Sequence, residues 1–263
     1  MIRIAAVQHG IVWEDPEANY PRYADHVARA AGRGADLVVF SEMFTTGFSM
    51  DSARLAEPPF GPTVRFLTEQ AARHAVWVGG SIAEHTEGHD RPTNRFILAG
   101  PTGELHRYSK VHPFSYSGED EHYSPGQTTL TVAVKGVNVT PFVCYDLRFA
   151  DLFWDVAEET DCYVVIANWP ASRRSHWSAL LRARAIENQA YVVGVNRIGT
   201  DGNDLSYAGD SAIFDPMGEE LAATHDEVET IIDAVVDPDH VLSVRARFPF
   251  LSDRRPQRPA PEG

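Results

Sequence analysis

The sequence predicts an α/β fold in a single domain, on three observations. Short apolar runs typical of buried strands alternate along the chain with segments of helical periodicity. Each half also contains a hairpin with a Pro-x-Gly turn, at residues 101–103 and 216–218, which hints at two related, facing sheets. No low-complexity block or linker divides the 263 residues. We therefore expect one body built from strands and helices.

The composition is that of a soluble globular protein, since 43% of the residues are hydrophobic and 23% are charged. The 37 acidic residues outnumber the 23 basic ones, which gives a net charge of −14. This balance argues against a nucleic-acid partner and against an anionic membrane surface, because both require a basic stripe. A small anionic substrate remains possible, because a single arginine can bind it.

The cysteines and the N-terminus indicate the cytoplasm. Cys144 and Cys162 are too few for a disulfide framework, and no Cys-x-x-Cys pair suggests zinc binding or redox activity. The first eight residues lack the long apolar core of a signal peptide. No apolar run approaches the roughly 20 residues of a membrane span. We expect a reducing compartment and no membrane association.

The first strand–helix–strand unit ends at a carboxylate. Residues 2–8 predict a buried strand, and Asp15-Pro16 supplies an N-cap and a first-turn proline for the following helix. Residues 37–40 predict the next strand, and Glu42 lies at its C-terminal end, where α/β proteins place functional groups. Glu42 is either a catalytic group or an ordinary surface carboxylate.

Lys110 and a polar loop follow the first hairpin. A helix over residues 62–74 and a strand over 76–81 lead to the hairpin at 95–110, and Lys110 lies at its end. The acidic loop 118–126 comes next. It is long enough to be functional, and a solvated loop is the competing interpretation.

Cys144 lies between a predicted strand, residues 136–142, and a segment of helical spacing, residues 149–159. At such a junction, backbone N–H groups point toward an oxyanion, and a helix N-terminus or a nearby cation lowers the pKa of a thiol. A nucleophile is therefore one interpretation. The other is a core residue, since cysteine is among the most buried residue types.

The second half of the chain continues the alternation. Cys162 lies in a short apolar strand and is predicted to be a core residue. The other expected elements are a strand-end loop at 168–173, a helix at 174–188, a strand at 191–196, a hairpin at 211–223, a strand at 230–236 and a helix at 238–247. Residues 1–248 are expected to form the domain. The tail 249–263 is expected to be irregular, either disordered or at a subunit interface.

Several other catalytic motifs are missing from the sequence. It has no glycine-rich phosphate loop, and its histidines show no compact metal-ligand spacing. Gly209-Asp210-Ser211 lacks the flanking residues of a serine-hydrolase elbow. His112 and His122 could each serve a cysteine as a base, and both also have an ordinary loop interpretation.

Glu42, Lys110 and Cys144 thus stand at or just beyond predicted strand ends. A carboxylate, an ammonium and a thiol in one site are chemically coherent. The cation would favour the thiolate and hold a tetrahedral oxyanion, and the carboxylate would move the protons.

At these residues the sequence resembles the nitrilase, or carbon–nitrogen hydrolase, superfamily. The resemblance extends from Val7-Gln8 to Phe248-Pro249. Three motifs in the family's order carry it: Ser41-Glu42-Met43-Phe44, Tyr108-Ser109-Lys110-Val111-His112 and Val143-Cys144-Tyr145-Asp146-Leu147-Arg148-Phe149. The resemblance implies a four-layer αββα sandwich of two mixed sheets, and a homodimer that extends the sandwich across the subunit interface.

The resemblance also implies catalytic roles. Glu42 is similar to the general base that takes the Cys144 proton and later helps to release ammonia. Lys110, helped by the backbone N–H of Tyr145, is similar to the oxyanion stabiliser.

A second glutamate of the family stands in the pattern Glu-x-x-x-Tyr/Phe-x-x-Gly. Glu119 fits this spacing with Tyr123 and Gly126, and it is preferred to the neighbouring Glu121. The resemblance implies that Glu119 orients the lysine.

Within the superfamily the sequence is most similar to the ω-amidase branch, over residues 42–48, 144–149, 168–173 and 182–189. That branch hydrolyses the terminal amide of α-keto dicarboxylic acid monoamides, giving 2-oxoglutarate or oxaloacetate and ammonia. The reaction passes through a thioester and needs no metal or organic cofactor.

The same resemblance suggests how the substrate is bound. Arg148 would bind its carboxylate, since a guanidinium matches a carboxylate bidentately. A structural salt bridge is the alternative for Arg148. Phe44 and Trp169 would line the pocket, although aromatic residues at strand ends also serve simply as packing.

Other functions remain open. A neutral aliphatic amidase, a nitrilase or an N-carbamoyl hydrolase would use the same catalytic residues. A non-catalytic scaffold is disfavoured by the intact catalytic set. A thiol redox sensor is disfavoured because Cys162 is too buried to resolve a sulfenic acid at Cys144.

Overall fold

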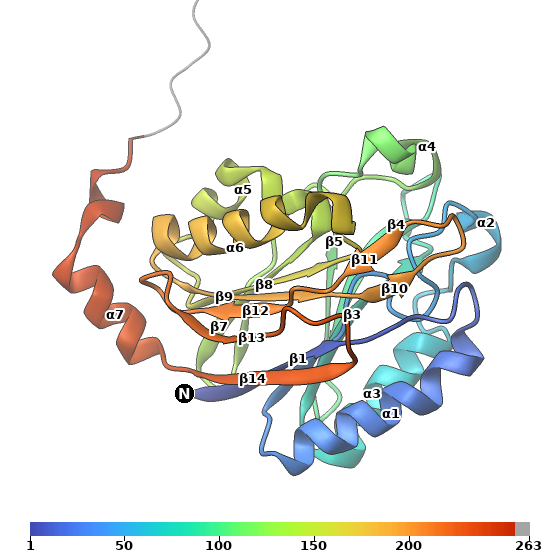
Figure 1. Cartoon of the computed structure of the whole chain (residues 1–263), viewed down its shortest axis with the longest axis horizontal. Coiled ribbons are helices and arrows are strands. Elements are labelled where there is room, and N and C mark those ends of the chain that lie inside the picture. Colours follow the sequence, from blue (N-terminus) through green and yellow to red (C-terminus); the bar gives the residue numbers. More distant parts are fainter. Residues whose placement is uncertain (256–263) are drawn as a thin grey trace, which may run out of the picture.

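The computed structural model describes residues 1–255 and shows two six-stranded sheets packed face to face between two layers of helices (Figure 1). In spatial order the first sheet contains β14 (Thr230–Val236), β1 (Ile2–Gln8), β2 (Leu37–Val39), β3 (Trp77–Glu84), β4 (Thr93–Ala99) and β5 (Leu105–Ser109). The second contains β13 (Glu220–Ala223), β12 (Ala212–Phe214), β9 (Tyr191–Asn196), β8 (Cys162–Ala167), β7 (Val137–Val143) and β6 (Val132–Val134).

Both sheets are mixed in the same way. The three strands β1, β2 and β3 are parallel, as are β7, β8 and β9, and the flanking strands are antiparallel. The predicted αββα sandwich is therefore confirmed, and the two Pro-x-Gly hairpins lie in different sheets.

Each sheet carries helices on its outer face. The helices α1 (Pro16–Gly32) and α3 (Pro62–His74) pack on the first sheet, and α5 (Ala150–Asp155) and α6 (Arg174–Asn188) pack on the second. The helix α7 (Pro238–Arg247) follows β14 at one end of the molecule (Figure 1). Shorter elements are α2 (Ser52–Leu55), η1 (Ser115–Ser117), α4 (Glu119–His122), η2 (Cys144–Arg148), η3 (Ala171–Arg173), β10 (Ile198–Thr200), β11 (Ser206–Ala208) and η4 (Phe250–Asp253).

The strand β1 shows why the central strands are almost continuously apolar. Ile4 and Ala6 face the core between the two sheets, whereas Ala5 and Val7 face the layer of α1 and α3. Successive side chains of a strand point to opposite faces, so a strand covered on both faces needs apolar residues at nearly every position.

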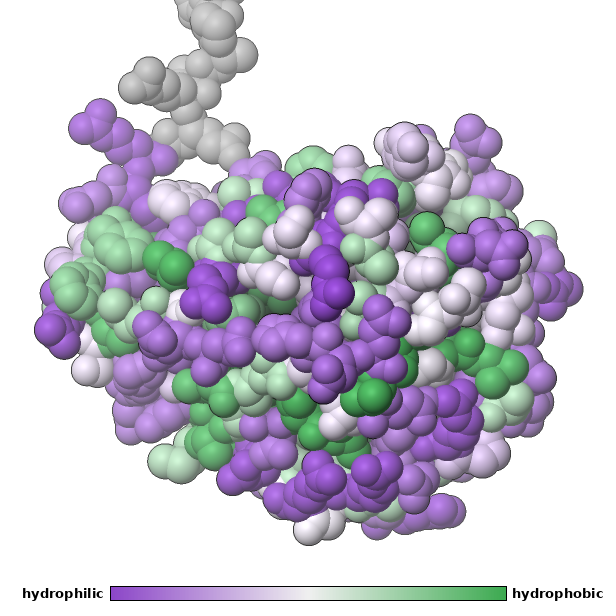
Figure 2. Space-filling view, viewed as in Figure 1, coloured by the Kyte–Doolittle hydropathy of each residue, from purple (hydrophilic) through white to green (hydrophobic). Residues whose placement is uncertain are grey.

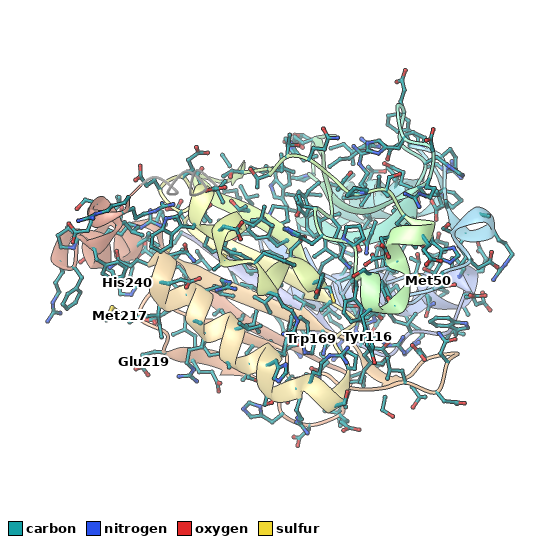
Figure 3. The ribbon with its side chains drawn as sticks, turned by 90° about the horizontal axis from the view of Figure 1, so that it is seen from above. Met50, Tyr116, Trp169, Met217, Glu219 and His240 are labelled. Carbon is teal, nitrogen blue, oxygen red and sulfur yellow. The ribbon has the colours of Figure 1, made fainter. Side chains whose placement is uncertain are left out.

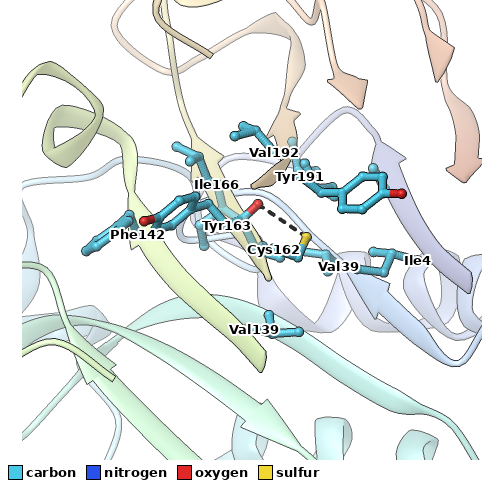
Figure 4. Packing of buried hydrophobic residues seen from close by; sticks show 14 of the residues in the cluster. Ile4, Val39, Val139, Phe142, Cys162, Tyr163, Ile166, Tyr191 and Val192 are labelled. Carbon is cyan, nitrogen blue, oxygen red and sulfur yellow. Dashed lines mark hydrogen bonds between the residues drawn. The ribbon is translucent and has the colours of Figure 1, made fainter. Parts of the chain in front are cut away.

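Cys162 lies in the core between the sheets, as predicted (Figure 4). It is fully buried, and its S–H donates to the carbonyl of Tyr163 at 3.7 Å. Val139 and Phe142 of β7 belong to the same cluster. Cys162 is therefore a packing residue.

The helix predicted for residues 149–159 is shorter in the structure. A 3₁₀ turn, η2, begins at Cys144 itself, and α5 ends at Asp155. By contrast α1 begins as predicted, with Asp15 accepting from the Ala18 N–H at 3.1 Å and with Pro16 in its first turn. The hairpin of β10 and β11 was not predicted, because its strands are only three residues long.

The tail predicted to be irregular is partly ordered. The turn η4 buries Leu251, and Arg254 donates to the carbonyl of Trp154 in α5. The rest of the tail, residues 256–263, lies outside the described residues. Within residues 1–255, no helix combines the length and the apolar character that crossing a bilayer requires.

Candidate active site

Four polar residues predicted from the sequence converge at one edge of the sandwich, where strands of both sheets end. Glu42 follows β2, Lys110 follows β5, Glu119 begins α4 and Cys144 follows β7. Glu42, Lys110 and Glu119 are fully buried, and Cys144 is half-buried. Polar groups at the carboxyl ends of parallel strands are the site arrangement that α/β folds favour.

Lys110 lies between two carboxylates. Its Nζ donates to Glu42 Oε1 at 2.9 Å and to the two oxygens of Glu119 at 3.1 and 2.8 Å. Burial alone would lower the pKa of Lys110, but Glu119 and Glu42 raise it well above its ordinary value, so the ammonium stays charged. Burial raises the pKa of Glu119, and Lys110 opposes that rise.

The buried glutamate of the acidic loop is Glu119, not Glu121, which is exposed. The loop is docked directly on the lysine strand, because the Gly126 N–H donates to the Lys110 carbonyl at 2.7 Å. A Cβ at Gly126 would lie 2.1 Å from the Ser109 carbonyl oxygen, so only glycine fits there. The solvated-loop interpretation is wrong for Glu119.

Two asparagines to which the sequence analysis gave no role complete the polar network. Asn94 Nδ2 donates to Glu42 Oε1 at 2.7 Å and to Glu119 Oε1 at 3.1 Å. The Asn168 backbone N–H donates to Glu42 Oε2 at 2.9 Å. The Asn168 carbonyl oxygen lies 4.0 Å from the Cys144 sulfur. Each oxygen of Glu42 is thus held by a donor on a different strand end.

Cys144 has a backbone φ of +49°, in the left-handed region that L-residues avoid. The turn that follows is braced by buried side chains. Asp146 Oδ2 accepts from the Val143 N–H at 3.1 Å, and Arg184 Nη2 donates to the Leu147 carbonyl at 2.7 Å. Non-glycine residues held in this way cluster at functional sites.

The surroundings of Cys144 raise its thiol pKa. Burial and the Glu42 carboxylate raise it well above its ordinary value, and Lys110 offsets this only in part. Lys110 favours the thiolate, as expected, but burial and the Glu42 carboxylate outweigh it. A thiol whose pKa is raised in this way needs a base to become a nucleophile.

The two histidines considered as bases have structural contacts. The His112 N–H donates to Asp146 Oδ1 at 2.9 Å, and its ring stacks on Phe149 with 3.7 Å between centroids. His122 is exposed, and its carbonyl accepts from Ser52 Oγ. Among residues 1–255, no three His, Cys, Asp or Glu side chains are grouped so as to hold a metal ion.

An open cavity leads to Cys144, with a mainly aromatic and apolar wall. Figure 3 labels two of its lining residues, Met50 and Trp169. The wall is formed by Phe48, Met50, Phe114, Ser117, Cys144, Tyr145, Arg148, Asn168, Trp169, Pro170, Arg173, Asp201, Asn203, Leu205 and Tyr207. Such a cavity suits a small organic ligand oriented by a few polar groups.

Two guanidiniums line this cavity. Arg148 lies over the Trp169 ring at 4.7 Å and donates to His176 Nδ1 at 3.3 Å. Arg173, to which the sequence analysis gave no role, lies over the Phe114 ring at 5.6 Å. Within the described residues, neither guanidinium lies within 4.0 Å of a carboxylate oxygen. The salt-bridge interpretation of Arg148 is therefore not supported.

Phe44 does not line the cavity, in contrast to the prediction. It is fully buried and stacks on Phe40 with 5.0 Å between centroids, in the core beneath α1 and α3. Phe48, from the same aromatic loop, lines the cavity instead. Trp169 lines it as predicted.

Comparison with known proteins gives concordant matches over almost the whole chain. The family model described as carbon–nitrogen hydrolase matches residues 3–246. The ω-amidase YafV of Escherichia coli (strain K12) is 39% identical over 255 residues, which cover 96% of each chain. The 2-oxoglutaramate amidase of Paenarthrobacter nicotinovorans is 37% identical over 237 residues, covering 84% of this chain and 79% of that protein. The crystal structure of XC1258 from Xanthomonas campestris, a CN-hydrolase superfamily protein, superposes with a TM-score of 0.92 at 38% identity, covering 98% and 99% of the two chains.

Proposed function

The chain belongs to the carbon–nitrogen hydrolase family, and we propose that it hydrolyses the terminal amide of small α-keto dicarboxylic acid monoamides. Its products would be the keto diacid and ammonia, with 2-oxoglutaramate and 2-oxosuccinamate as substrates. The names of the ω-amidase and 2-oxoglutaramate amidase relatives support this assignment. In the structure itself, the observation that carries it is the buried Glu42–Lys110–Glu119 cluster next to the Cys144 thiol.

Acylation begins with proton transfer from Cys144 to Glu42. The sulfur attacks the amide carbon, and the resulting oxyanion is stabilised by Lys110 and by the backbone N–H of Tyr145. Glu42 then gives the proton to the amide nitrogen, the C–N bond breaks and ammonia leaves. A thioester between the acyl group and Cys144 remains.

Deacylation repeats these steps with water. Glu42 takes a proton from the water, the hydroxide attacks the thioester carbon, and the same donors hold the second oxyanion. The C–S bond breaks, and the sulfur recovers its proton from Glu42. Glu119 keeps the Lys110 ammonium oriented throughout, through the two hydrogen bonds between them.

The cavity supports a substrate with an anionic end. Arg148 would bind the carboxylate, and Trp169 under its guanidinium fixes the position of that cation. Arg173 supplies a second positive group on the same wall. In an acidic protein, two cavity guanidiniums that have no carboxylate partner among residues 1–255 suit an anionic ligand.

Ammonia release distinguishes this proposal from its alternatives. 2-Oxoglutaramate and 2-oxosuccinamate would be compared with a neutral aliphatic amide, an N-carbamoyl amino acid and a nitrile. We expect turnover of the two keto acid amides by the wild type, and loss of turnover with an unchanged melting temperature in Cys144→Ala. Turnover of the neutral amide alone would refute the proposed substrate class but leave the role of Cys144 as the nucleophile intact. Full activity of Cys144→Ala would refute the mechanism.

We also propose that the hydrolase domain comprises residues 1–248 and that the protein is a cytoplasmic homodimer. Apolar surface lies at the end of the molecule where α7 is located (Figure 2). Leu242, Phe248 and Phe250 are exposed there, which suits a subunit contact. Light scattering should give twice the mass of one chain, and Leu242→Glu should shift the protein toward the monomer. A monomeric wild type would contradict the proposal.

A further inference from the structure

Asn94 touches both carboxylates of the active site and is itself 1% exposed. Its Nδ2 donates to Glu42 Oε1 at 2.7 Å and to Glu119 Oε1 at 3.1 Å. Lys110 Nζ donates to the same two oxygen atoms, at 2.9 and 3.1 Å. Two nitrogen atoms therefore bridge one pair of oxygens in a closed ring, with the ammonium on one side and the amide on the other.

The orientation of the Asn94 amide is set by a second hydrogen-bonded chain. Ser81 Oγ donates to Asn94 Oδ1 at 2.8 Å and accepts from the Met43 N–H at 2.9 Å. Since ionised carboxylates only accept, Nδ2 must face Glu42 and Glu119. Met43 has a φ of +42°, so the same chain anchors the strained turn directly after Glu42.

We propose that Asn94 is a positioning residue for hydrolysis, which holds the carboxylates of Glu42 and Glu119 on the two sides of Lys110 and keeps Glu42 aimed at Cys144. This inference rests on the proposed roles of Glu42, Lys110 and Cys144. Asn94 itself touches neither the substrate nor the sulfur in this mechanism.

The charges around Asn94 explain why the site needs it. Besides Glu42 and Glu119, the titratable groups that face this network are Lys110 after β5, Cys144 after β7, Tyr123 after α4 and Tyr207 on β11. Lys110 is the one cation of this set. Two buried carboxylates that share one cation repel each other, and an additional N–H to both favours their charged forms. Without it, one carboxylate would take up a proton at a higher pH.

The test is the pH dependence of kcat/KM for Asn94→Ala and Asn94→Asp, measured on the amide that the wild type hydrolyses fastest. We expect the midpoint of the acidic limb to move up by roughly one pH unit or more, because a hydrogen bond to a charged group is lost. The shift should be larger for Asn94→Asp, which adds a third carboxyl group of nearly the same size. KM should change little, and kcat at neutral pH should fall roughly 10- to 100-fold.

A second readout needs no substrate. Alkylation of Cys144 by iodoacetamide, followed by mass spectrometry across the same pH range, reports when the base next to the thiol is ionised. Its acidic midpoint should move in the same direction in both Asn94 variants. If the wild type hydrolyses neither keto acid amide while this shift is present, the substrate proposal fails and the role of Asn94 stands.

Two further variants separate positioning from packing. Asn19→Ala removes an equally buried amide that donates to loop carbonyls, those of Val12 at 2.8 Å and Thr45 at 2.9 Å. It should lower the melting temperature without moving the acidic midpoint. Ser81→Ala should move the midpoint in the same direction by less, and it keeps the test valid if the Asn94 variants do not fold. Wild-type midpoints in every folded variant at positions 94 and 81 would overturn the proposal.

Discussion

Two ionic clusters around buried carboxylates lie on either side of β4 and have opposite charge balance. In one, the Glu84 carboxylate at the end of β3 lies between two guanidiniums, with Arg95 Nε at 3.5 Å and Arg107 Nε at 3.3 Å. In the other, the Lys110 ammonium lies between Glu42 and Glu119. Asn94 and Arg95 are neighbours on β4, so the strand places one cluster on each of its faces.

The difference shows what turns a buried ion cluster into a catalytic one. Burial raises the pKa of Glu84, and Arg107 and Arg95 oppose this by stabilising the carboxylate. No thiol or other proton donor for catalysis lies among the three charged groups of this cluster. In the cluster at Glu42, two carboxylates share one cation and the Cys144 thiol lies next to them, which brings a proton donor and a base together. The two clusters therefore differ in their charge balance and in the thiol that only one of them contains.

The largest expected effect is the loss of activity when the carboxylate of the Glu42 cluster is neutralised. Glu42→Gln should lower kcat by roughly 10²- to 10⁴-fold, because a neutral amide of the same size cannot accept the thiol proton. Steady-state kinetics with the preferred amide would measure this loss, with circular dichroism as the check on folding. A folded variant with more than a tenth of wild-type kcat would show that Glu42 is not the base.

Glu119→Gln should have the next largest effect. The amide keeps one oxygen for Lys110 but turns a donor toward either the Asn94 amide or the Phe114 N–H, which donates to Glu119 Oε2. We expect kcat to fall roughly 10- to 100-fold with little change in KM, since the ammonium is displaced and not lost. A rise in KM with an unchanged kcat would show instead that Glu119 contributes to substrate binding.

Unpaired and paired arginines can be compared next. Arg148→Met should raise KM for the keto acid amides about 10- to 100-fold, because a charge-assisted contact with the substrate carboxylate is lost. Hydrolysis of a neutral amide should hardly change. Arg107→Met is the matched control, since its guanidinium is already paired with Glu84. Equal effects of Arg148→Met on charged and neutral amides would contradict the assignment.

The smallest effect concerns stability alone. Arg107→Met should lower the free energy of unfolding at neutral pH by about 1–3 kcal/mol, since the buried Glu84 loses a charged partner. This loss should shrink as the pH falls through the folded-state pKa of Glu84, which lies above its ordinary value. Once Glu84 is protonated in both states, Arg107 no longer favours the folded one. Denaturant unfolding at several pH values would test this, and a pH-independent loss would show that packing dominates.

The sequence predicts the parts of this site that depend on local order along the chain. Alternation of strands and helices places Glu42, Lys110 and Cys144 at strand ends. The family spacing selects Glu119, which the structure buries.

What the sequence misses depends on contacts between distant segments and on single backbone angles. Asn94 stands between two other polar residues at the start of β4, and its partners lie 52 and 25 residues away in the chain. Phe44 and Phe48 belong to one aromatic loop, and composition does not tell which faces the cavity. The left-handed turn at Met43 precedes the point where Phe44 enters the core. The short 3₁₀ turn at Cys144 likewise follows from long-range bracing by Arg184, not from helical periodicity.

At Cys144 the side chain that catalysis needs has a backbone φ that lowers the stability of the fold. An L-side chain in this region costs about 1–2 kcal/mol, whereas glycine adopts it without that penalty. Of two inactive variants, Cys144→Gly should therefore melt at a higher temperature than Cys144→Ala. Laboratory evolution for heat resistance alone would have a reason to discard the nucleophile, so any such campaign on this protein must select for turnover at every round.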